Sequence, residues 1–250
     1  MNVLEKYVET SRGKIWYLEM GSGKKTLLYL HGWMGTPERA ITISHNLEKN
    51  GFKVIAPYLP GHGDSFKLVD GFTFNDLVSS MEEFFEELEL SNIFAIGHSV
   101  GGAVIYELAN TEAGYIKKAV IIDGYNNFRH VGAFKVALLV VKELFRKELF
   151  KTFFHLYTKP LAKKATASAV MKCDALIKTL CPSPFNPRND QNIFLFIWGV
   201  NDELTPESEW LKATGISKDR VVNFPGGHCW CVIHLGKTWP TIEKFLYASS

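Results

Sequence analysis

The chain has 250 residues, of which 46% are hydrophobic and 13% aromatic, so it can bury a large core within one α/β unit. Its formal net charge of +2 is too small to indicate nucleic acid as the main partner. The stretch 1–14 carries charges where a signal peptide needs an apolar core, and no stretch reaches the ~20 uninterrupted apolar residues of a membrane span. We therefore expect a soluble, cytoplasmic protein.

Short apolar runs alternate with longer amphipathic patterns, which is typical of a mostly parallel sheet with helices between its strands. The predicted strands are Val3–Thr10, Lys14–Glu19, Thr26–Leu30, Phe52–Ala56, Ile93–Ile96, Ala119–Ile122, Ile193–Trp198 and Val221–Phe224. The predicted helices run over 36–50, 73–89, Val100–Asn110, Pro206–Ala213 and His234–Tyr247. The first two strands flank Ser11–Gly13 and form an antiparallel hairpin. The pattern thus predicts an α/β fold with a sheet of about eight strands and helices on both faces.

The alternation breaks between Gly124 and Gln191, where no convincing strand occurs. Residues 133–157 and 160–180 have amphipathic helical patterns instead. We interpret 124–191 as a helical insertion into a single domain that spans 1–250, rather than as a second domain.

The insertion is strongly basic. Residues 132–172 hold nine basic and two acidic side chains, which gives +7 and leaves −5 for the rest of the chain. A solvated basic face explains this charge, and the alternative is peripheral contact with an anionic lipid surface or a carrier-bound substrate.

The four cysteines lie late in the chain and form no C-x-x-C pair: Cys173, Cys181, Cys229 and Cys231. This spacing favours free, mostly buried thiols over disulfides. A metal site at Cys229 and Cys231 beside His228 is only weakly indicated, because no second ligand pair occurs.

One short motif carries a chemical signal. Gly97-His98-Ser99-Val100-Gly101 matches G-x-S-x-G and lies between a predicted strand and a predicted helix, as a nucleophile elbow requires. A sharp turn leaves no space for side chains next to the serine, which explains the two glycines. The N-terminus of the following helix favours negative charge near the hydroxyl. We therefore predict Ser99 as a nucleophile.

Four segments occur in the order typical of the α/β-hydrolases: His31–Trp33, Leu59–Ser65, Gly97–Gly102 and Trp198–Asp202. Through these segments the chain resembles that family over nearly its full length. The resemblance implies an α/β-hydrolase fold in which the insertion 124–191 is a helical cap. The apolar side chains of the cap would then cover Ser99 and form the acyl pocket.

A serine nucleophile needs a base, and the chain offers eight histidines. Six are set aside, because they belong to loop motifs that the family uses for turn shape and hydrogen bonding, to predicted helices or to the insertion: His31, His62, His98, His45, His130 and His155. Of the two that remain, His228 follows the last predicted strand in a loop that can reach the carboxyl edge of the sheet. His234 begins a helix, where it is expected to pack or cap. We therefore predict His228 as the base.

The imidazole needs an acceptor on its other nitrogen. The resemblance places this acceptor at Asp202, in the loop after the penultimate strand. The order Ser99, Asp202, His228 is the one expected for this fold. Asp123, which follows the preceding strand, remains a rival because some family members use that position. Glu203 is a poorer candidate, one residue out of phase with the loop motif.

Acyl transfer also needs donors for the developing oxyanion. The backbone N–H of Val100 is one predicted donor. The resemblance assigns the other to the N–H of Trp33, with Met34 as the alternative. The Trp33 side chain then either lines the pocket or packs as a core aromatic.

Together these residues predict a serine hydrolase that cleaves carboxylic esters of small to medium acyl chains through an acyl-enzyme on Ser99. A thioesterase, a lipase-like enzyme, a C–C bond hydrolase and a lyase similar to the menaquinone-pathway synthases remain alternatives on the same three residues. A family member that binds a ligand and does not turn it over is a further class of function. Serine in place of aspartate argues against the dehalogenase and epoxide hydrolase branches. A serine hydrolase of this kind implies a small-molecule substrate and neither a metal nor an organic cofactor. The oligomeric state stays open.

Overall fold

The computed structural model describes residues 2–33, 35–111, 113–124, 174–180, 183–186 and 190–248. Most of the predicted cap 124–191 therefore lies outside the described residues, including the basic stretch, the apolar pocket lining, Cys173 and Cys181. The alternative oxyanion residue Met34 also lies outside them. Within the predicted second cap helix, the described part contains one short helix, α8 (Asp174–Thr179).

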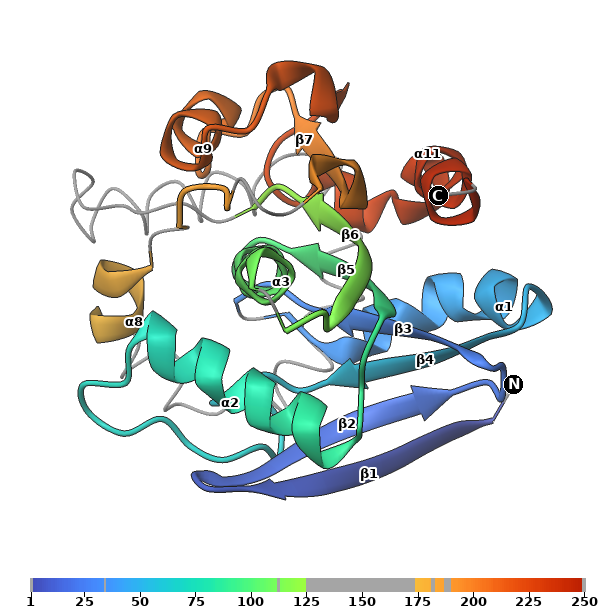
Figure 1. Cartoon of the computed structure of the whole chain (residues 1–250), viewed down its shortest axis with the longest axis vertical. Coiled ribbons are helices and arrows are strands. Elements are labelled where there is room, and N and C mark those ends of the chain that lie inside the picture. The colour runs from blue at the N-terminus through green and yellow to red at the C-terminus, as the bar shows by residue number, and fades with distance from the viewer. Residues whose placement is uncertain are drawn as a thin grey trace.

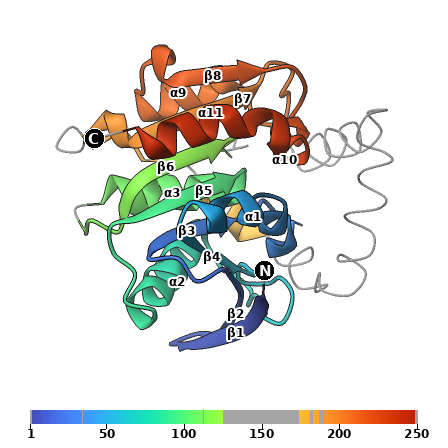
Figure 2. The same cartoon turned by 90° about the vertical axis from the view of Figure 1, so that its right-hand side faces the viewer.

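Eight strands form one sheet in the order β1-β2-β4-β3-β5-β6-β7-β8 (Figures 1 and 2). The strands are β1 (Val3–Thr10), β2 (Gly13–Met20), β3 (Lys25–Leu30), β4 (Phe52–Pro57), β5 (Ile93–His98), β6 (Ile116–Ile122), β7 (Phe194–Gly199) and β8 (Val221–Phe224). β2 pairs antiparallel with β1 and with β4, whereas every pair from β4 to β8 is parallel. The predicted sheet of about eight mostly parallel strands is confirmed.

Helices cover both faces of this sheet. They are α1 (Ile41–Lys49), which follows a 3₁₀ turn at Pro37–Ala40, α2 (Phe74–Glu87), α3 (Val100–Asn110), α9 (Glu207–Thr214), α10 (Trp230–Ile233) and α11 (Leu235–Tyr247). α2 and α3 lie on one face, and α1 and α11 lie together on the other (Figures 1 and 2). Each face has its own core of buried side chains.

The amphipathic pattern of α2 shows why these residues form a helix. Thr73 caps its N-terminus, because its side chain accepts from the Asp76 N–H while the Asp76 carboxylate accepts from the Thr73 N–H. Leu77, Met81 and Phe84 recur at helical spacing and are fully buried.

The parallel strands end at one edge of the sheet, so the loops that follow β3, β5, β6, β7 and β8 gather there. These loops hold Ser99, Asp202 and His228, and Val100 follows at the start of α3. In the part of the chain that the structure describes, no helix is both long and apolar enough to cross a membrane.

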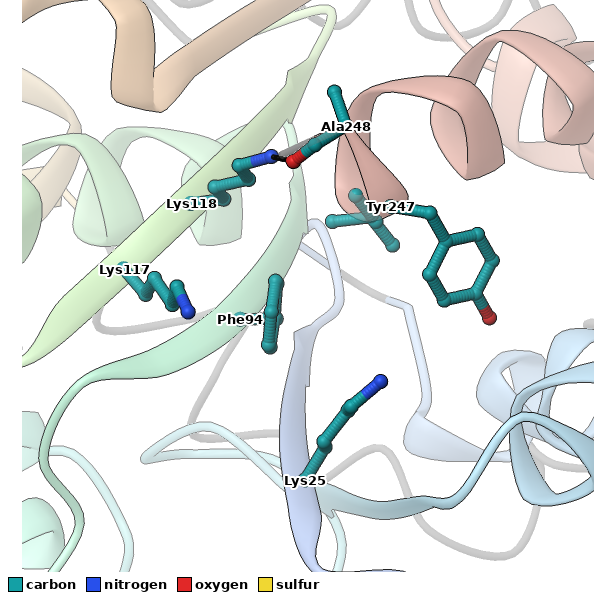
Figure 3. A pocket seen from close by; sticks show the side chains of 7 residues that line it. Lys25, Phe94, Lys117, Lys118, Tyr247 and Ala248 are labelled. Carbon is teal, nitrogen blue, oxygen red and sulfur yellow. Dashed lines mark hydrogen bonds between the residues drawn. The ribbon is translucent and has the colours of Figure 1, made fainter. Parts of the chain in front are cut away.

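Strand β6 begins three residues before the predicted start, at Ile116 rather than Ala119. Lys117 and Lys118 precede the apolar run on which the predicted strand rests. In the fold, Lys118 is only 7% exposed and donates hydrogen bonds to the carbonyls of Phe245 (2.8 Å) and Ala248 (2.6 Å). Figure 3 shows its ammonium group directed at the backbone of Ala248, at the end of α11.

Lys118 therefore caps the carboxyl end of α11, where helix carbonyls have no partner within the helix. Burial, followed by the charge of Lys117, lowers the pKa of Lys118 below its ordinary value. The two carbonyls are the acceptors that compensate the burial of its ammonium group.

We expect Lys118→Met to lower the free energy of unfolding by about 2 kcal/mol, because it removes two hydrogen bonds to a charged donor while keeping the length of the stem. Urea denaturation at neutral pH measures this loss. Lys117→Met is the matched control, since Lys117 is exposed on the same strand, and its effect should stay within about 0.5 kcal/mol. Equal losses in both variants would contradict the capping role.

Candidate active site

Ser99 lies at the turn between β5 and α3. Its backbone has φ 53° and ψ −119°, a strained conformation for a residue other than glycine. The Ser99 N–H donates to the carbonyl of Ile122 at 2.9 Å, which holds the turn against β6. A Cβ added to Gly97 would lie 2.5 Å from the Gly101 carbonyl oxygen, and one added to Gly101 would lie 2.5 Å from the Leu30 carbonyl oxygen. The two glycines are therefore sterically required.

His228 comes within hydrogen-bond distance of both of its predicted partners. Its Nε2 lies 2.9 Å from the Ser99 Oγ, and its Nδ1 lies 2.8 Å from the Asp202 Oδ2. All three side chains are nearly buried, with exposed fractions of 4% to 7%. The fold thus brings Ser99, His228 and Asp202 together from three separate loops.

The loops that carry Asp202 and His228 are joined directly. The Asn201 N–H donates to the Gly226 carbonyl at 2.8 Å, and the Val200 N–H donates to the Phe224 carbonyl at 2.9 Å. A Cβ on Gly199 would lie 2.7 Å from the Gly227 oxygen, so only glycine permits this approach. This contact sets the distance between the carboxylate and the imidazole.

The Asp202 carboxylate is held by four hydrogen-bond contacts. Its Oδ1 accepts from the N–H groups of Leu204 and Thr205, both at 2.9 Å. Its Oδ2 accepts from the Thr205 hydroxyl at 2.7 Å and faces the His228 Nδ1. Burial alone would raise the pKa of Asp202, but the charge of His228 and these hydrogen bonds outweigh it and hold the pKa below its ordinary value. The group is therefore a carboxylate at neutral pH.

Asp123, the rival acid, lies at the end of β6 in a different environment. Its side chain is fully buried, its φ is 45°, and its Oδ1 accepts from the Gly199 N–H at 2.7 Å. Burial, and after it the charges of Asp123 and Asp202, raise the pKa of the Cys231 thiol. Of the two aspartates, it is Asp202 that the fold brings to the imidazole, and Asp123 supports the start of the loop after β7.

Comparison with known proteins identifies the family of this chain. The family model described as "alpha/beta hydrolase fold" matches residues 25–168, more than half of the chain. The chain belongs to this family. The match includes the Ser99 turn, whereas the loops that carry Asp202 and His228 lie beyond it.

Several characterised proteins resemble this α/β-hydrolase. A thermostable monoacylglycerol lipase of Bacillus sp. (strain H-257) is 34% identical over 107 residues, 42% of each chain. A non-heme haloperoxidase of Rhodococcus erythropolis is 30% identical over 118 residues, 46% of this chain and 43% of the relative. The chain thus spans less than half the length of these relatives. The family and the names of its relatives support a hydrolase.

Solved structures match over almost the entire chain. A structure from work on the carboxylesterases of Nitrososphaera gargenis superposes with a TM-score of 0.72, covering 96% of this chain and 97% of that one at 20% identity. At that identity the likeness shows the fold alone.

The two predicted oxyanion donors of this α/β-hydrolase belong to segments that border Ser99. Val100 is the first residue of α3, directly after the serine. A Cβ on Gly32 would lie 3.1 Å from the Ser99 Cβ, so the backbone that leads into Trp33 runs against the serine. The Trp33 ring is partly buried and packs edge-on against His62, with centroids 4.8 Å apart.

The remaining candidates occupy other roles. The His234 ring packs against Trp230 with centroids 4.7 Å apart, and its carbonyl accepts from the Lys237 N–H at the start of α11. This agrees with the prediction that His234 packs or caps. Glu203 is exposed. Cys229 and Cys231 are not joined in a disulfide, and no group of three possible metal ligands occurs among the described residues.

Three further histidines are buried around the site in the neutral form. His98 Nε2 lies 3.0 Å from the His228 carbonyl, and His31 Nε2 accepts from the Leu59 N–H at 3.1 Å. Burial is the main cause that lowers the pKa of His62 to about 4, of His98 to about 3, and of His31 well below its ordinary value. Their role is structural, since a neutral ring at these positions ties loop to loop.

We expect these histidines to make the protein sensitive to acid. Because their pKa values are about 6.5 in the unfolded chain and lower in the folded one, the unfolded state binds more protons below pH 6.5. The free energy of unfolding that these neutral histidines contribute is thus complete above about pH 6.5, and it is lost as the pH falls toward the folded pKa values. His62 and His98 should each lower the free energy of unfolding at pH 5 by about 2 kcal/mol relative to its value at pH 7.5.

Urea denaturation at the two pH values checks this expectation. His62→Gln removes one of the titrating groups, so it should reduce the difference between pH 7.5 and pH 5 by about 2 kcal/mol. An equal pH difference in the wild type and in this variant would contradict the assignment.

Two contacts of the site were not predicted from the sequence. One is the His98 ring beside the His228 carbonyl, and the other is the Thr205 hydroxyl beside Asp202. A sequence signal exists for the turn that Thr205 follows, because aspartate side chains commonly accept from the backbone two residues on, as Asp202 does from the Leu204 N–H.

Proposed function

We propose that this α/β-hydrolase is a serine hydrolase that cleaves carboxylic esters of small to medium acyl chains. One observation carries the proposal: the chain of contacts from the Ser99 Oγ to the His228 Nε2 (2.9 Å) and from the His228 Nδ1 to the Asp202 Oδ2 (2.8 Å). This is the arrangement that converts a serine hydroxyl into a nucleophile.

In the proposed reaction, the Ser99 Oγ attacks the ester carbonyl while the His228 Nε2 takes the hydroxyl proton. The N–H groups of Val100 and Trp33 donate to the oxyanion of the tetrahedral intermediate. His228 then gives the proton to the departing alcohol, which leaves an acyl group on Ser99. Water attacks this acyl-enzyme with His228 again as base; the second tetrahedral intermediate then collapses, His228 returns the proton to the Ser99 Oγ, and the carboxylic acid leaves. Asp202 keeps the imidazole in the tautomer that has its proton on Nδ1 and stabilises the imidazolium.

The names of relatives support ester chemistry without fixing the substrate. They include a monoacylglycerol lipase and, among solved structures of the same fold, an esterase from Exiguobacterium antarcticum. The relative named a haloperoxidase and another named a soluble epoxide hydrolase show that proteins of other activities share part of this sequence. The serine at the turn is the feature that favours an acyl-enzyme.

A series of p-nitrophenyl esters with increasing acyl length tests the proposal, together with labelling by a fluorophosphonate probe. We expect covalent labelling of Ser99 and hydrolysis with an optimum at short to medium chains. Labelling without hydrolysis of any ester would point instead to a thioester, a C–C bond or an elimination. Neither labelling nor hydrolysis would indicate a ligand-binding protein and overturn the proposal.

A further inference from the structure

The hydroxyl of Thr205 lies between the acid and the base of the site. Its Oγ1 is 2.7 Å from the Asp202 Oδ2 and 3.1 Å from the His228 Nδ1. The residue is only 1% exposed. A third side chain therefore contacts both of the atoms that form the Asp202–His228 pair.

The contacts among Asp202, Thr205 and His228 determine which of their atoms carry a proton. His228 Nδ1 faces a carboxylate at 2.8 Å, so this nitrogen carries a proton and donates. The Thr205 hydroxyl can then only accept from Nδ1, and it uses its single proton to donate to Asp202. The other acceptor within reach, the Asp123 carbonyl at 3.5 Å, is much farther away. As a result, both oxygens of the Asp202 carboxylate accept two contacts each, which fills the capacity of the group.

The backbone of Thr205 is fixed on both sides, so its hydroxyl has little freedom to leave this position. Its N–H donates to the Asp202 Oδ1 at 2.9 Å, and its carbonyl accepts from the Trp198 Nε1 at 2.7 Å. Trp198 is fully buried in β7. Pro206, which has a fixed φ, follows directly and precedes α9. The core of the protein thus holds the hydroxyl in place before any substrate arrives.

We propose that Thr205 is a positioning residue of the site. Its hydroxyl fixes the orientation of the Asp202 carboxylate and gives the His228 Nδ1 proton a second acceptor, and both contacts strengthen when the imidazole becomes charged during turnover. This inference rests on the proposed function insofar as turnover is its readout. Because the contact acts when charge develops on His228, its loss should lower kcat and leave KM unchanged.

Three variants test the proposal with the p-nitrophenyl ester that the wild type hydrolyses best. Thr205→Val keeps the shape of the side chain and removes the hydroxyl; kcat should fall about tenfold or more, which corresponds to ~1.4 kcal/mol. Thr205→Ser keeps the hydroxyl and should retain kcat within about threefold. Thr214→Val is the matched control: Thr214 is 2% exposed and donates to the Trp210 carbonyl at 2.9 Å, away from the triad. This control should lose stability and keep its kcat.

The three kcat values decide the role of the hydroxyl. The proposal is overturned if Thr205→Val keeps kcat within twofold, or if Thr205→Ser is as impaired as Thr205→Val, because packing rather than the hydroxyl would then matter. A fall in kcat for Thr214→Val as large as that for Thr205→Val would likewise assign the effect to stability. Should Thr205→Val fail to fold, Thr205→Ala takes its place in the same comparison.

A second readout separates this proposal from the proposed function. The proton on His228 Nδ1 gives a resonance in the NMR spectrum that is independent of any substrate. The resonance should shift in Thr205→Val and stay in place in Thr214→Val. Ester hydrolysis could then be absent in the wild type while the shift still supports the positioning role; an unchanged resonance would overturn that role even in an active esterase.

Discussion

Replacement of Ser99 by alanine is expected to lower kcat for ester hydrolysis by about 10⁴-fold or more. Alanine removes the only atom that the proposed mechanism places in bonding distance of the substrate carbonyl, and it leaves His228 without a proton to accept. A residual activity above the uncatalysed rate should remain, since the backbone donors of the oxyanion hole are unchanged. Steady-state hydrolysis and fluorophosphonate labelling measure the effect.

Ser80→Ala is the matched control for this experiment. Ser80 is also fully buried, and its hydroxyl donates to the Asp76 carbonyl at 2.7 Å within α2, a helix that carries none of the predicted site residues. Its loss should leave kcat and labelling unchanged. Persistent labelling of the Ser99→Ala protein would show that the probe reacts elsewhere and would contradict the assignment of Ser99.

Replacement of Asp202 by asparagine should lower kcat by about 10³- to 10⁴-fold while the protein stays folded. The amide oxygen can still accept from the N–H groups of Leu204 and Thr205. The amide nitrogen then faces the His228 Nδ1, which must become an acceptor, so the ring proton moves to Nε2. In that tautomer the imidazole cannot take the proton from Ser99.

Asp123→Asn separates the two candidate acids. The amide oxygen at this position can keep the hydrogen bond from the Gly199 N–H. The carboxylate that faces the His228 Nδ1 is that of Asp202. We expect kcat to stay within about a factor of five of the wild-type value. Near-normal activity in Asp202→Asn together with loss in Asp123→Asn would reverse the assignment.

The sheet was predictable because its strands are apolar runs bounded by turn residues, and this pattern is local. The start of β6 was predicted wrongly because it depends on a contact between segments that are distant in the sequence. From the local sequence alone, Lys118 is expected to lie on the surface. It is buried because α11, more than a hundred residues later, supplies the carbonyls that its ammonium group binds. A buried charge becomes acceptable only through a partner that the local pattern does not contain.

Ser99 could be assigned from the sequence because the turn that carries it is defined by five consecutive residues. The glycines, the preceding strand and the following helix are all written within that stretch, and the contacts of Gly97 and Gly101 show why no larger residue fits. His228 and Asp202 needed the family order as well, since each is one of several residues of its type near a strand end.

The amino-acid sequence by itself determined the class of fold and the candidate nucleophile, because these follow from local patterns, and the family order added the candidates Asp202 and His228. Only the tertiary structure decided that Asp202 rather than Asp123 meets His228, and that Thr205 contacts both. The two aspartates follow neighbouring parallel strands, so both reach the same edge of the sheet. Their distances to His228 depend on the hydrogen bonds that join the loop after β7 to the loop after β8, and such contacts between distant segments exist only once the chain is folded.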